Sequence, residues 1–442
     1  MLPDRTAAPA ETRPRIVIVG AGFAGLACAR VLANAPAEVT VIDRRNHNLF
    51  QPLLYQVATA ALSPADVSEP IRRTLARARN VTVILGEATG VDLDRKTVSM
   101  RDAPSLSYDT LVLAMGSQYN YFGHDDWRDH APGLKTVHEA RLIRHRLLSA
   151  FERAERMSDP RAQRETLTFV IVGAGPTGVE MAGSVSELGR SMIGSDFRNL
   201  SPAAFRVVLI EAGPRILPAF PENLAAYAKD FLENLGVDVR LETEVLEVGE
   251  DGIVTSEGPV PAGCVVWAAG VRASPAADWL GVAPDRQGRV KVSADLSLPG
   301  HPDVFVLGDT AHAADSAGEP LPALAQVAKQ QGTYLGRRLR RQLQGKPPGD
   351  PFFRFHNRGN TAVIGRNAAI FDFGRWTLKG RFAWLLWAIV HVLLLVNFEK
   401  RMLVSLQWIW RYATRQRGAR LIDEDYRHRR APAHPRNPAH GE

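Results

Sequence analysis

Cysteine is scarce in this chain of 442 residues, which contains only Cys28 and Cys264. Two separated cysteines exclude a disulfide scaffold, a cysteine-based zinc site and an iron–sulfur cluster, and they are typical of a reduced compartment. The histidines have no metal-ligand spacing, so we predict no metal site. The length is about three times that of a typical single domain and favours two or three packed units.

Long hydrophobic runs are also scarce. Residues 382–398, FAWLLWAIVHVLLLVNF, approach membrane-spanning length, but 17 residues are at the lower limit for crossing a bilayer. One marginal span excludes a polytopic channel or a proton pump. Residues 1–14 contain no apolar run of signal-peptide length, so we predict a disordered arm there and no export.

Acidic residues are fewer than basic ones, and the formal net charge is +7. Residues 400–442 contain ten Lys or Arg against four Asp or Glu and carry +6 of this excess, so the rest of the chain is nearly neutral. A basic end directly after the most apolar segment favours an anionic membrane surface over a nucleic-acid groove. We therefore predict a lipid bilayer surface, and no nucleic acid, as a partner.

The N-terminal region contains a glycine-rich turn between a strand and a helix. The strand RIVIVG is followed by GAGFAG, with glycines at Gly20, Gly22 and Gly25, and the next strand ends on Asp43, 23 residues after Gly20. Such glycines allow a tight turn and close approach of a pyrophosphate to a helix N-terminus, and the acid can bind a ribose. Strand, turn, helix, strand and acid together predict a dinucleotide-binding unit.

The same unit recurs from Leu167. Its turn contains Gly173, Gly175 and Gly178, and the acid is Glu211, 38 residues after Gly173. This spacing is about fifteen residues longer than usual, so we expect a helix extension or a loop around residues 188–205. Two units imply two different nucleotides. A decayed structural duplicate is the alternative, although both copies keep all three glycines and the acid.

Three further apolar segments predict how the two units are connected. Residues 111–116, LVLAMG, and residues 264–270, CVVWAAG, each close one unit, and residues 303–309, DVFVLGD, form another buried strand. We expect the last strand to return to the first unit. The fold class is therefore α/β with two Rossmann-like domains, the second inserted in the first (residues 15–120 and 291–345 around 121–290), plus a C-terminal membrane-associating helical region at 346–442.

Several long motifs in this order carry a family resemblance. They are NLFQPLLYQVAT, LVLAMGSQYNYFG, VIVGAGPTGVE, VFVLGDTAH, AQVAKQQG and the C-terminal AWLLWAIVHVLLLVNF followed by RGARLI. The chain resembles the two-dinucleotide-binding flavoprotein disulfide reductases in layout. Within them it is similar to the type II NADH:quinone oxidoreductases, or alternative NADH dehydrogenases, over residues 15 to about 422.

This resemblance implies cofactors and site residues. FAD would occupy the N-terminal unit and NADH the inserted unit, where Glu180 would lie near the nicotinamide and the flavin ring. The glutamines Gln326 and Gln330 would contact the quinone, with Lys379 close by. The residues implied for FAD are Gly20, Gly22, Gly25, Asp43, Gly116, Gly308 and Asp309, and those implied for NADH are Gly173, Gly175, Gly178 and Glu211.

The residues alone leave alternatives open. Glu180 can instead cap or pair within the second domain, and Gln326 and Gln330, four residues apart, can form a solvated helix face. A sulfide:quinone oxidoreductase would need a pair of cysteines at the flavin, where we do not expect Cys28 and Cys264 to meet. A non-catalytic NADH-sensing flavoprotein would reduce its flavin once and stop.

The C-terminal segment after residue 400 predicts a surface-lying attachment. A helical wheel gathers Met402, Leu403, Leu406, Ile409, Trp410 and Ala413 on one side, whereas Val404, Trp408 and Tyr412 fit it imperfectly. Aromatic residues beside arginines suit the headgroup level of a membrane. We favour monotopic attachment to the cytoplasmic face of the cell membrane, with one true span or a soluble homodimer interface as alternatives.

Overall fold

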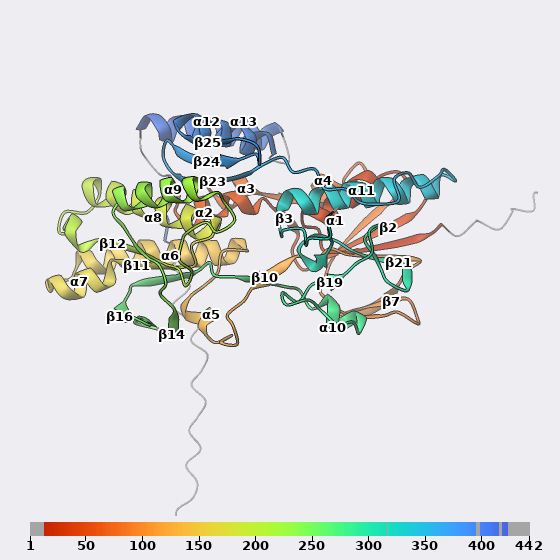
Figure 1. Ribbon diagram of the computed structural model, residues 1–442, viewed down its shortest axis with the longest axis horizontal. Helices are drawn as coiled ribbons and strands as arrows, with labels where there is room; N and C mark the ends of the chain where they lie inside the picture. The colour runs from red at the N-terminus through yellow and green to blue at the C-terminus, as the bar shows by residue number, and fades with distance from the viewer. Residues whose placement is uncertain (1–12, 316, 395–397, 415–417, 423–442) are drawn as a thin grey trace, which may run out of the picture.

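The first of two parallel sheets gathers strands from both ends of the chain (Figure 1). The computed structural model describes residues 13–315, 317–394, 398–414 and 418–422. The strand order is β20 (Ser297–Leu298), β21 (His301–Val306), β9 (Thr110–Leu113), β1 (Arg15–Val19), β2 (Glu38–Asp43) and β5 (Val81–Leu85). Pairing is parallel except between β20 and β21.

Helices α1 (Phe23–Val31) and α11 (Ala325–Leu343) lie on one face of this sheet and pack closely against each other. Glycines make the contact possible. A Cβ at Gly332 would lie 2.0 Å from the carbonyl oxygen of Ala24, and one at Gly336 would lie 2.8 Å from the Cβ of Val31. The two backbones therefore touch where any larger side chain would separate them.

The second sheet is formed by β13 (Val237–Arg240), β12 (Arg206–Ile210), β11 (Thr168–Val172) and β17 (Cys264–Trp267), all parallel. Helices α6 (Val137–Glu155), α8 (Pro176–Ser195) and α9 (Glu222–Asn234) surround it, and β14 (Val245–Gly249), β15 (Gly252–Thr255) and β16 (Gly258–Pro261) form a meander. The extra residues after the second glycine turn lengthen α8 and form a loop, as expected.

The chain returns to the first sheet after completing the second, because β21 pairs with β9. The prediction of an inserted second unit is confirmed. The two units are joined by β10 (Ser117–Tyr119) and β18 (Val271–Ala273), which pair antiparallel directly after β9 and β17. The carboxyl ends of β9 and β17 therefore lie close to each other, at the junction of the two units.

Shorter elements complete the two units. They are β3 (His47–Leu49), η1 (Gln51–Leu53), α2 (Leu54–Ala58), α3 (Pro64–Val67), β4 (Ser68–Pro70), α4 (Ile71–Thr74), β6 (Ala88–Asp92), β7 (Thr97–Met100), β8 (Ala103–Ser107), α5 (Trp127–His130), α7 (Pro160–Thr166), η2 (Pro202–Ala204), α10 (Ala276–Leu280), β19 (Val290–Lys291), η3 (Gly308–Thr310) and β22 (Ala311–His312).

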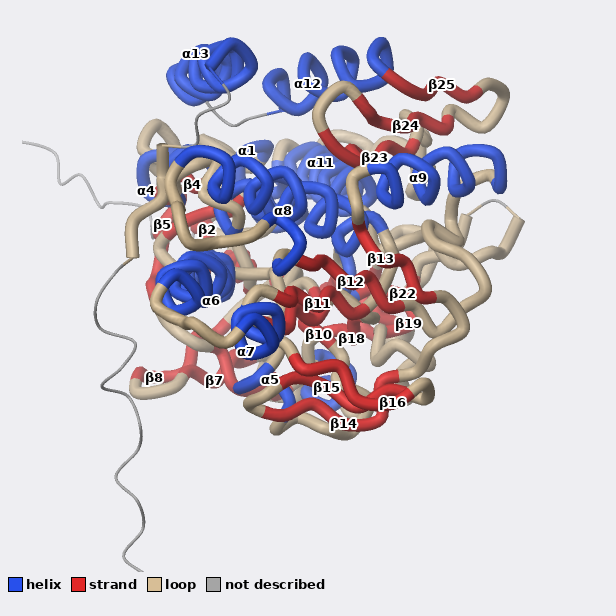
Figure 2. The backbone as a smooth tube through the Cα atoms, turned by 90° about the vertical axis from the view of Figure 1, so that its left-hand side faces the viewer, coloured by secondary structure: helices blue, strands red, loops and turns tan. Residues whose placement is uncertain are grey.

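A third layer lies above both units (Figures 1 and 2). It consists of an antiparallel sheet of β23 (Asn360–Gly365), β24 (Ala368–Asp372) and β25 (Thr377–Gly380), which α12 (Arg381–Leu394) covers. Helix α13 (Phe398–Thr414) packs beside α12 and against α3. In the described part of the chain, no helix is both long and apolar enough to cross a membrane. The apolar run 382–398 is not one described helix, since α12 ends at Leu394 and residues 395–397 lie outside the described residues.

Parts of the predicted termini also lie outside the described residues. These are residues 1–12 of the predicted arm and residues 415–417 and 423–442 of the basic tail.

Candidate active site

The first glycine turn has the geometry that a dinucleotide requires. Gly20 has a φ of +96°, and a Cβ at Gly25 would lie 1.9 Å from the carbonyl oxygen of Gly20, so neither position accepts a larger residue. A Cβ at Gly22 would have no heavy atom within 4 Å, and α1 begins there without a side-chain cap. Free N–H groups therefore face open space, as an anion site at a helix N-terminus needs.

Asp43 is held in place by the same turn. One of its carboxylate oxygens accepts a hydrogen bond from the Ala21 N–H at 2.7 Å, and the other accepts one from Arg45 N–H at 2.8 Å. The buried Asn48 side chain donates to the carbonyl oxygen of Ala21 at 2.8 Å. The acid is thus oriented before any ligand arrives.

The second turn repeats these contacts almost atom for atom. Gly173 has a φ of +97°, and a Cβ at Gly178 would lie 1.8 Å from the Gly173 carbonyl oxygen. Glu211 accepts hydrogen bonds from Ala174 N–H at 2.7 Å and from Gly213 N–H at 2.9 Å. The open position corresponding to Gly22 is Gly175, around whose Cβ no heavy atom lies within 4 Å.

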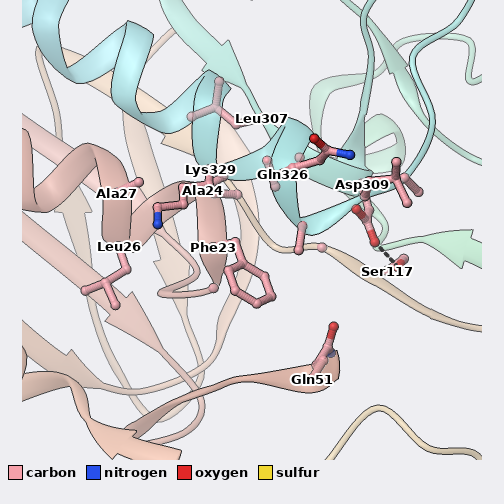
Figure 3. Close-up of a pocket in the computed structure, with 18 of the residues that line it drawn as sticks. Phe23, Ala24, Leu26, Ala27, Gln51, Ser117, Leu307, Asp309, Gln326 and Lys329 are labelled. Atoms are coloured by element: carbon pink, nitrogen blue, oxygen red, sulfur yellow. Dashed lines mark hydrogen bonds between the residues drawn. The ribbon is translucent and has the colours of Figure 1, made fainter. Parts of the chain in front are cut away.

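Asp309 lies in η3, directly after β21, and its side chain points to Ser117 (Figure 3). Its carboxylate accepts a hydrogen bond from the Ser117 hydroxyl at 2.6 Å, and the Lys135 ammonium donates to the same hydroxyl at 2.9 Å. Burial lowers the pKa of Lys135, and the charges of Asp309 and Glu139 partly offset this. The three groups form a chain across the junction of the two units.

Two other contacts hold the turn around Asp309. The buried Gln331 side chain accepts a hydrogen bond from Gly308 N–H at 2.7 Å, and the Thr310 hydroxyl donates to the Gly116 carbonyl at 3.1 Å. Sequence reasoning missed Ser117, Lys135 and Gln331. Because Ser117 closely follows a predicted strand, the sequence could have indicated it as a site residue. No local sequence pattern indicates Lys135 or Gln331.

One cavity of about 2370 Å³ runs between these elements. Of the predicted site residues, Gly20, Gly22, Asp43, Gly116, Glu180, Gly308, Asp309, Gln326 and Gln330 line it. The second glycine turn does not line it, although its neighbours Pro176 and Thr177 do. The apolar side chains of Leu386, Val390, Leu393 and Leu394 from α12 form another part of its wall.

Glu180 lies on the inner wall of the cavity. It is the fifth residue of α8, which begins at Pro176, and is therefore more than a turn into the helix. One carboxylate oxygen is 3.5 Å from the Val363 N–H, a long contact. Loss of water around the charged form raises the pKa of Glu180 to about 8. The carboxyl is therefore mostly protonated at pH 7.

The two predicted quinone glutamines both bind the segment that precedes β23. Gln330 donates to the His356 carbonyl and accepts from the His356 N–H, both at 3.0 Å. Gln326 donates to the Gly359 carbonyl and accepts from the Arg358 N–H, both at 3.1 Å. They do not form a freely solvated helix face, because each amide is paired with backbone.

The structure does not bring Lys379 to these glutamines. Its side chain is exposed on β25, where its ammonium lies 5.2 Å from the ring centroid of Tyr227, and it does not line the cavity. β25 is the outer strand of its sheet, and pairing with Ile370 sets the register of Lys379. The position beside the glutamines that the resemblance implied for Lys379 is therefore not the one that the structure gives it.

His391 is packed rather than positioned as a ligand. It is buried, stacks on Trp387 with ring centroids 4.3 Å apart, and its Nδ1–H donates to the Trp387 carbonyl at 2.8 Å. Burial lowers its pKa to about 4, so the ring is neutral at pH 7. Among the described residues, no group of three or more His, Cys, Asp or Glu could hold a metal ion.

Comparison with known proteins agrees with this geometry. A family model for pyridine nucleotide-disulphide oxidoreductases matches residues 14–332. The type II NADH:quinone oxidoreductase Ndh of Mycobacterium tuberculosis is 39% identical over 434 residues, covering 95% of this chain and 92% of the relative. A second enzyme of that organism, NdhA, is 39% identical over 425 residues and covers 93% of this chain and 89% of the relative.

Solved structures show the same fold. The NDH2 of Plasmodium falciparum in complex with NADH has a TM-score of 0.83 and 21% identity, and the match covers 93% of this chain and all of that one. The sulfide:quinone oxidoreductase of Aquifex aeolicus is less similar, with a TM-score of 0.65 and 18% identity over 90% of this chain and 91% of that one.

Two dinucleotide units that meet at one cavity define a nucleotide-dependent oxidoreductase of the pyridine nucleotide-disulphide oxidoreductase class. The similarity over nearly the whole length narrows this class further. The chain belongs to the type II NADH:quinone oxidoreductases.

Proposed function

We propose that this protein oxidises NADH and reduces a membrane quinone, without pumping protons, through FAD bound at the first glycine turn. The observation that carries the proposal is the continuity of the cavity. It joins the first turn, Asp309 and Glu180 to the apolar wall of α12. A hydride donor and a hydrophobic acceptor can therefore reach one redox group from different sides.

The residues around the first turn fit FAD. Uncapped N–H groups at Gly22 face the open space that a pyrophosphate would occupy, Asp43 is oriented for a ribose, and Asp309 offers a carboxylate to the ribityl chain. FAD, when bound, would supply two-electron acceptance from NADH and electron delivery to the quinone. The Lys135 ammonium donates to the Ser117 hydroxyl. Its positive charge would stabilise the negative charge of a reduced flavin bound nearby.

NADH is assigned to the second turn. Glu211 is oriented toward the place of an adenosine ribose, and α8 would carry Glu180 toward the reacting end of the nucleotide. A protonated Glu180 can give its proton to a quinone oxygen as that oxygen gains negative charge. Reduction to the quinol takes one hydride equivalent from NADH and one proton. Glu180 would supply this proton and then be reprotonated from water, which balances the reaction.

The quinone would enter beside α12 and meet Gln326 and Gln330. Because both amides hold the backbone of residues 356–359, a quinone carbonyl must share or replace one of these hydrogen bonds. Neutral amides can orient the carbonyl without a buried charge.

The apolar faces of α12 and α13 are assigned to a bilayer surface. Phe382, Leu385, Ile389 and Leu393 are exposed on α12, and Met402, Leu403, Leu406, Ile409 and Trp410 are exposed on α13. Such aligned apolar stripes mark membrane or protein contacts. We place this face on the cytoplasmic side of the cell membrane. A homodimer interface is the second candidate for the same face.

A sulfide:quinone oxidoreductase activity is disfavoured by the cysteines. Cys28 is buried in α1 of the first unit, whereas Cys264 is buried in β17 of the second. Burial raises the pKa of their thiols to about 12 and about 11. Such thiols do not supply a thiolate pair at the flavin.

The test uses protein purified in detergent. Acid should release FAD, and NADH should be oxidised over many turnovers only when a short-chain quinone is present. Released FMN, or a flavin that NADH reduces once without subsequent quinone-driven turnover, would refute the proposal, the second result indicating a sensor.

A further inference from the structure

The turn that follows β10 has an aromatic residue where another residue type is favoured. His124 N–H donates to the Tyr121 carbonyl at 3.0 Å, and the two residues between them have a positive φ, +54° at Phe122 and +98° at Gly123. Positive φ at both central positions is the type I′ pattern, whose first central position favours asparagine, aspartate or glycine. Of the described residues with a positive φ, Phe122 is the only aromatic one.

Contacts with β17 hold this turn in place. The indole N–H of Trp267 donates to the Asn120 carbonyl at 2.9 Å, and the Asn120 side-chain oxygen accepts a hydrogen bond from Phe122 N–H, also at 2.9 Å. The ring of Tyr121 stacks on Trp267 with centroids 5.3 Å apart. The ring of Phe122 nevertheless stays 62% exposed, so burial of that ring does not account for a bulky residue in a strained conformation.

The exposed ring lies beside the second glycine turn. A Cβ at Gly173 would lie 2.7 Å from the backbone nitrogen of Ala269, and a Cβ at the next residue, Gly270, would lie 3.0 Å from Cζ of Phe122. Neither Phe122 nor the glycines of the second turn line the large cavity. The ring and the turn are therefore neighbours outside that cavity.

The strand order indicates which half of a nucleotide would meet this ring. The neighbouring strands are β12, β11 and β17 in that order. A dinucleotide on such a sheet places its adenosine ribose at the acid after β12, here Glu211, and its pyrophosphate at the glycine turn after β11. The other half then continues toward the end of β17, where Phe122 lies against Gly270. An exposed aromatic ring there can pack against a planar heteroaromatic ring.

We propose that the ring of Phe122 contacts the nicotinamide half of NADH and positions it. The inference rests on the proposed function for the binding of NADH at the second turn. It deepens that proposal by naming a side chain for the half of the nucleotide that Glu211 does not contact.

The test is a calorimetric titration of the oxidised holoenzyme with NAD⁺ and, in parallel, with ADP-ribose, which has the adenosine and both phosphates but no nicotinamide. Phe122→Asn removes the ring and suits the turn, whereas Phe122→Tyr keeps a ring. The matched control is Leu246→Asn. Leu246 is a 55% exposed apolar residue on β14 of the same unit, and it does not line the cavity.

We expect Phe122→Asn to weaken NAD⁺ binding by about threefold to tenfold and to change ADP-ribose binding by less than about twofold. Phe122→Tyr and the Leu246 control should bind both ligands like the parent. Phe122→Asn should unfold thermally at the parental temperature or above, because asparagine suits a positive φ. In turnover, KM for NADH should rise in Phe122→Asn while KM for the quinone stays the same.

Three results would overturn the proposal. They are unchanged NAD⁺ affinity in Phe122→Asn, an equal loss for NAD⁺ and ADP-ribose, and a loss that Phe122→Tyr does not rescue. A parent protein that binds neither ligand would refute the proposed NADH site, and this inference with it. Failure of the inference alone is recognised by a parent that binds NAD⁺ and a Phe122→Asn variant that binds it equally well.

Discussion

The two glycine turns have the same local geometry but different surroundings. In both, a glycine with φ near +96° starts the turn, a third glycine touches its carbonyl, and an acid binds the following N–H group. The first turn opens into the large cavity opposite Asp309, whereas the glycines of the second do not line that cavity. This difference in setting is consistent with the proposed roles, a resident cofactor at the first turn and an exchanging nucleotide at the second.

Replacing the third glycine of each turn should separate the two sites most strongly. Gly25→Ala and Gly178→Ala both force a Cβ to within 2 Å of a backbone oxygen, at 1.9 and 1.8 Å, and each should cost about 3 kcal/mol or more locally. Gly25→Ala should purify with little flavin. Gly178→Ala should retain flavin that NADH no longer bleaches, as absorbance spectra would report.

Gly194→Ala is the matched control, since it lies in α8 and no heavy atom lies within 4 Å of its Cβ. Equal flavin loss in the Gly25 and Gly178 variants would contradict the proposal that only the first turn binds the flavin.

The acid of the second turn should set nucleotide preference. Glu211 would accept the ribose hydroxyls and repel a 2′-phosphate, so kcat/KM should favour NADH over NADPH. Arg215, a residue that could receive the phosphate, donates instead to the carbonyls of Pro218 and Phe220. Glu211→Gln should reduce the preference about tenfold or more.

The corresponding change in the first turn, Asp43→Asn, is the control and should weaken flavin retention without altering nucleotide preference. An unchanged NADH to NADPH ratio in Glu211→Gln would show that this acid does not discriminate.

The quinone glutamines should affect only one half-reaction. Gln330→Ala removes the proposed hydrogen bond to a quinone carbonyl, worth roughly 0.5–1.5 kcal/mol, so quinone kcat/KM should fall by up to about tenfold. It also removes the two hydrogen bonds between this amide and the His356 backbone. Rapid mixing with NADH should still bleach the flavin at the parental rate. If NADH bleached the flavin more slowly while quinone reoxidised it at the parental rate, these glutamines would belong to the nicotinamide site.

A separate effect concerns the stability contribution of Glu180. Its pKa is raised from 4.5 to about 8, so the folded protein holds this proton more tightly than the unfolded chain. The protonated carboxyl contributes fully to the free energy of unfolding below pH 4.5. This contribution is lost as the pH rises to about 8, by at most about 1.4 kcal/mol per pH unit.

Relative to the parent, Glu180→Gln should gain stability as pH rises through this window, measured by denaturant unfolding. The exposed Glu319→Gln is the control and should follow the parent. Parallel curves for Glu180→Gln and the parent would contradict the raised pKa.

Local patterns predicted the parts of the molecule that local chemistry determines. Glycine spacing and the following acid identified both turns, because φ and close backbone contacts restrict those positions to glycine. The helical wheel placed Met402 and Ile409 outward, but it could not place Trp408, which stacks on Trp387 and donates to Gln56. That side chain has its own partners, so one apolar stripe does not describe the helix.

Contacts between distant segments were not predictable from single-sequence patterns. The hydrogen bonds from Ser117 to Asp309 and from Lys135 to Ser117 form only because the chain returns from the inserted unit to the first sheet. The pairing of Gln326 and Gln330 with residues 356–359 depends in the same way on how the following segment folds over α11.

The most direct measurement is gel filtration of the holoenzyme after incubation with NADH and a short-chain quinone, followed by analysis of the nucleotides that remain bound. The account predicts about one FAD and almost no nicotinamide nucleotide per chain, with a flavin that fresh NADH bleaches and quinone restores. Retained nicotinamide with lost flavin, or loss of both, would contradict the proposed resident site at the first turn and exchanging site at the second.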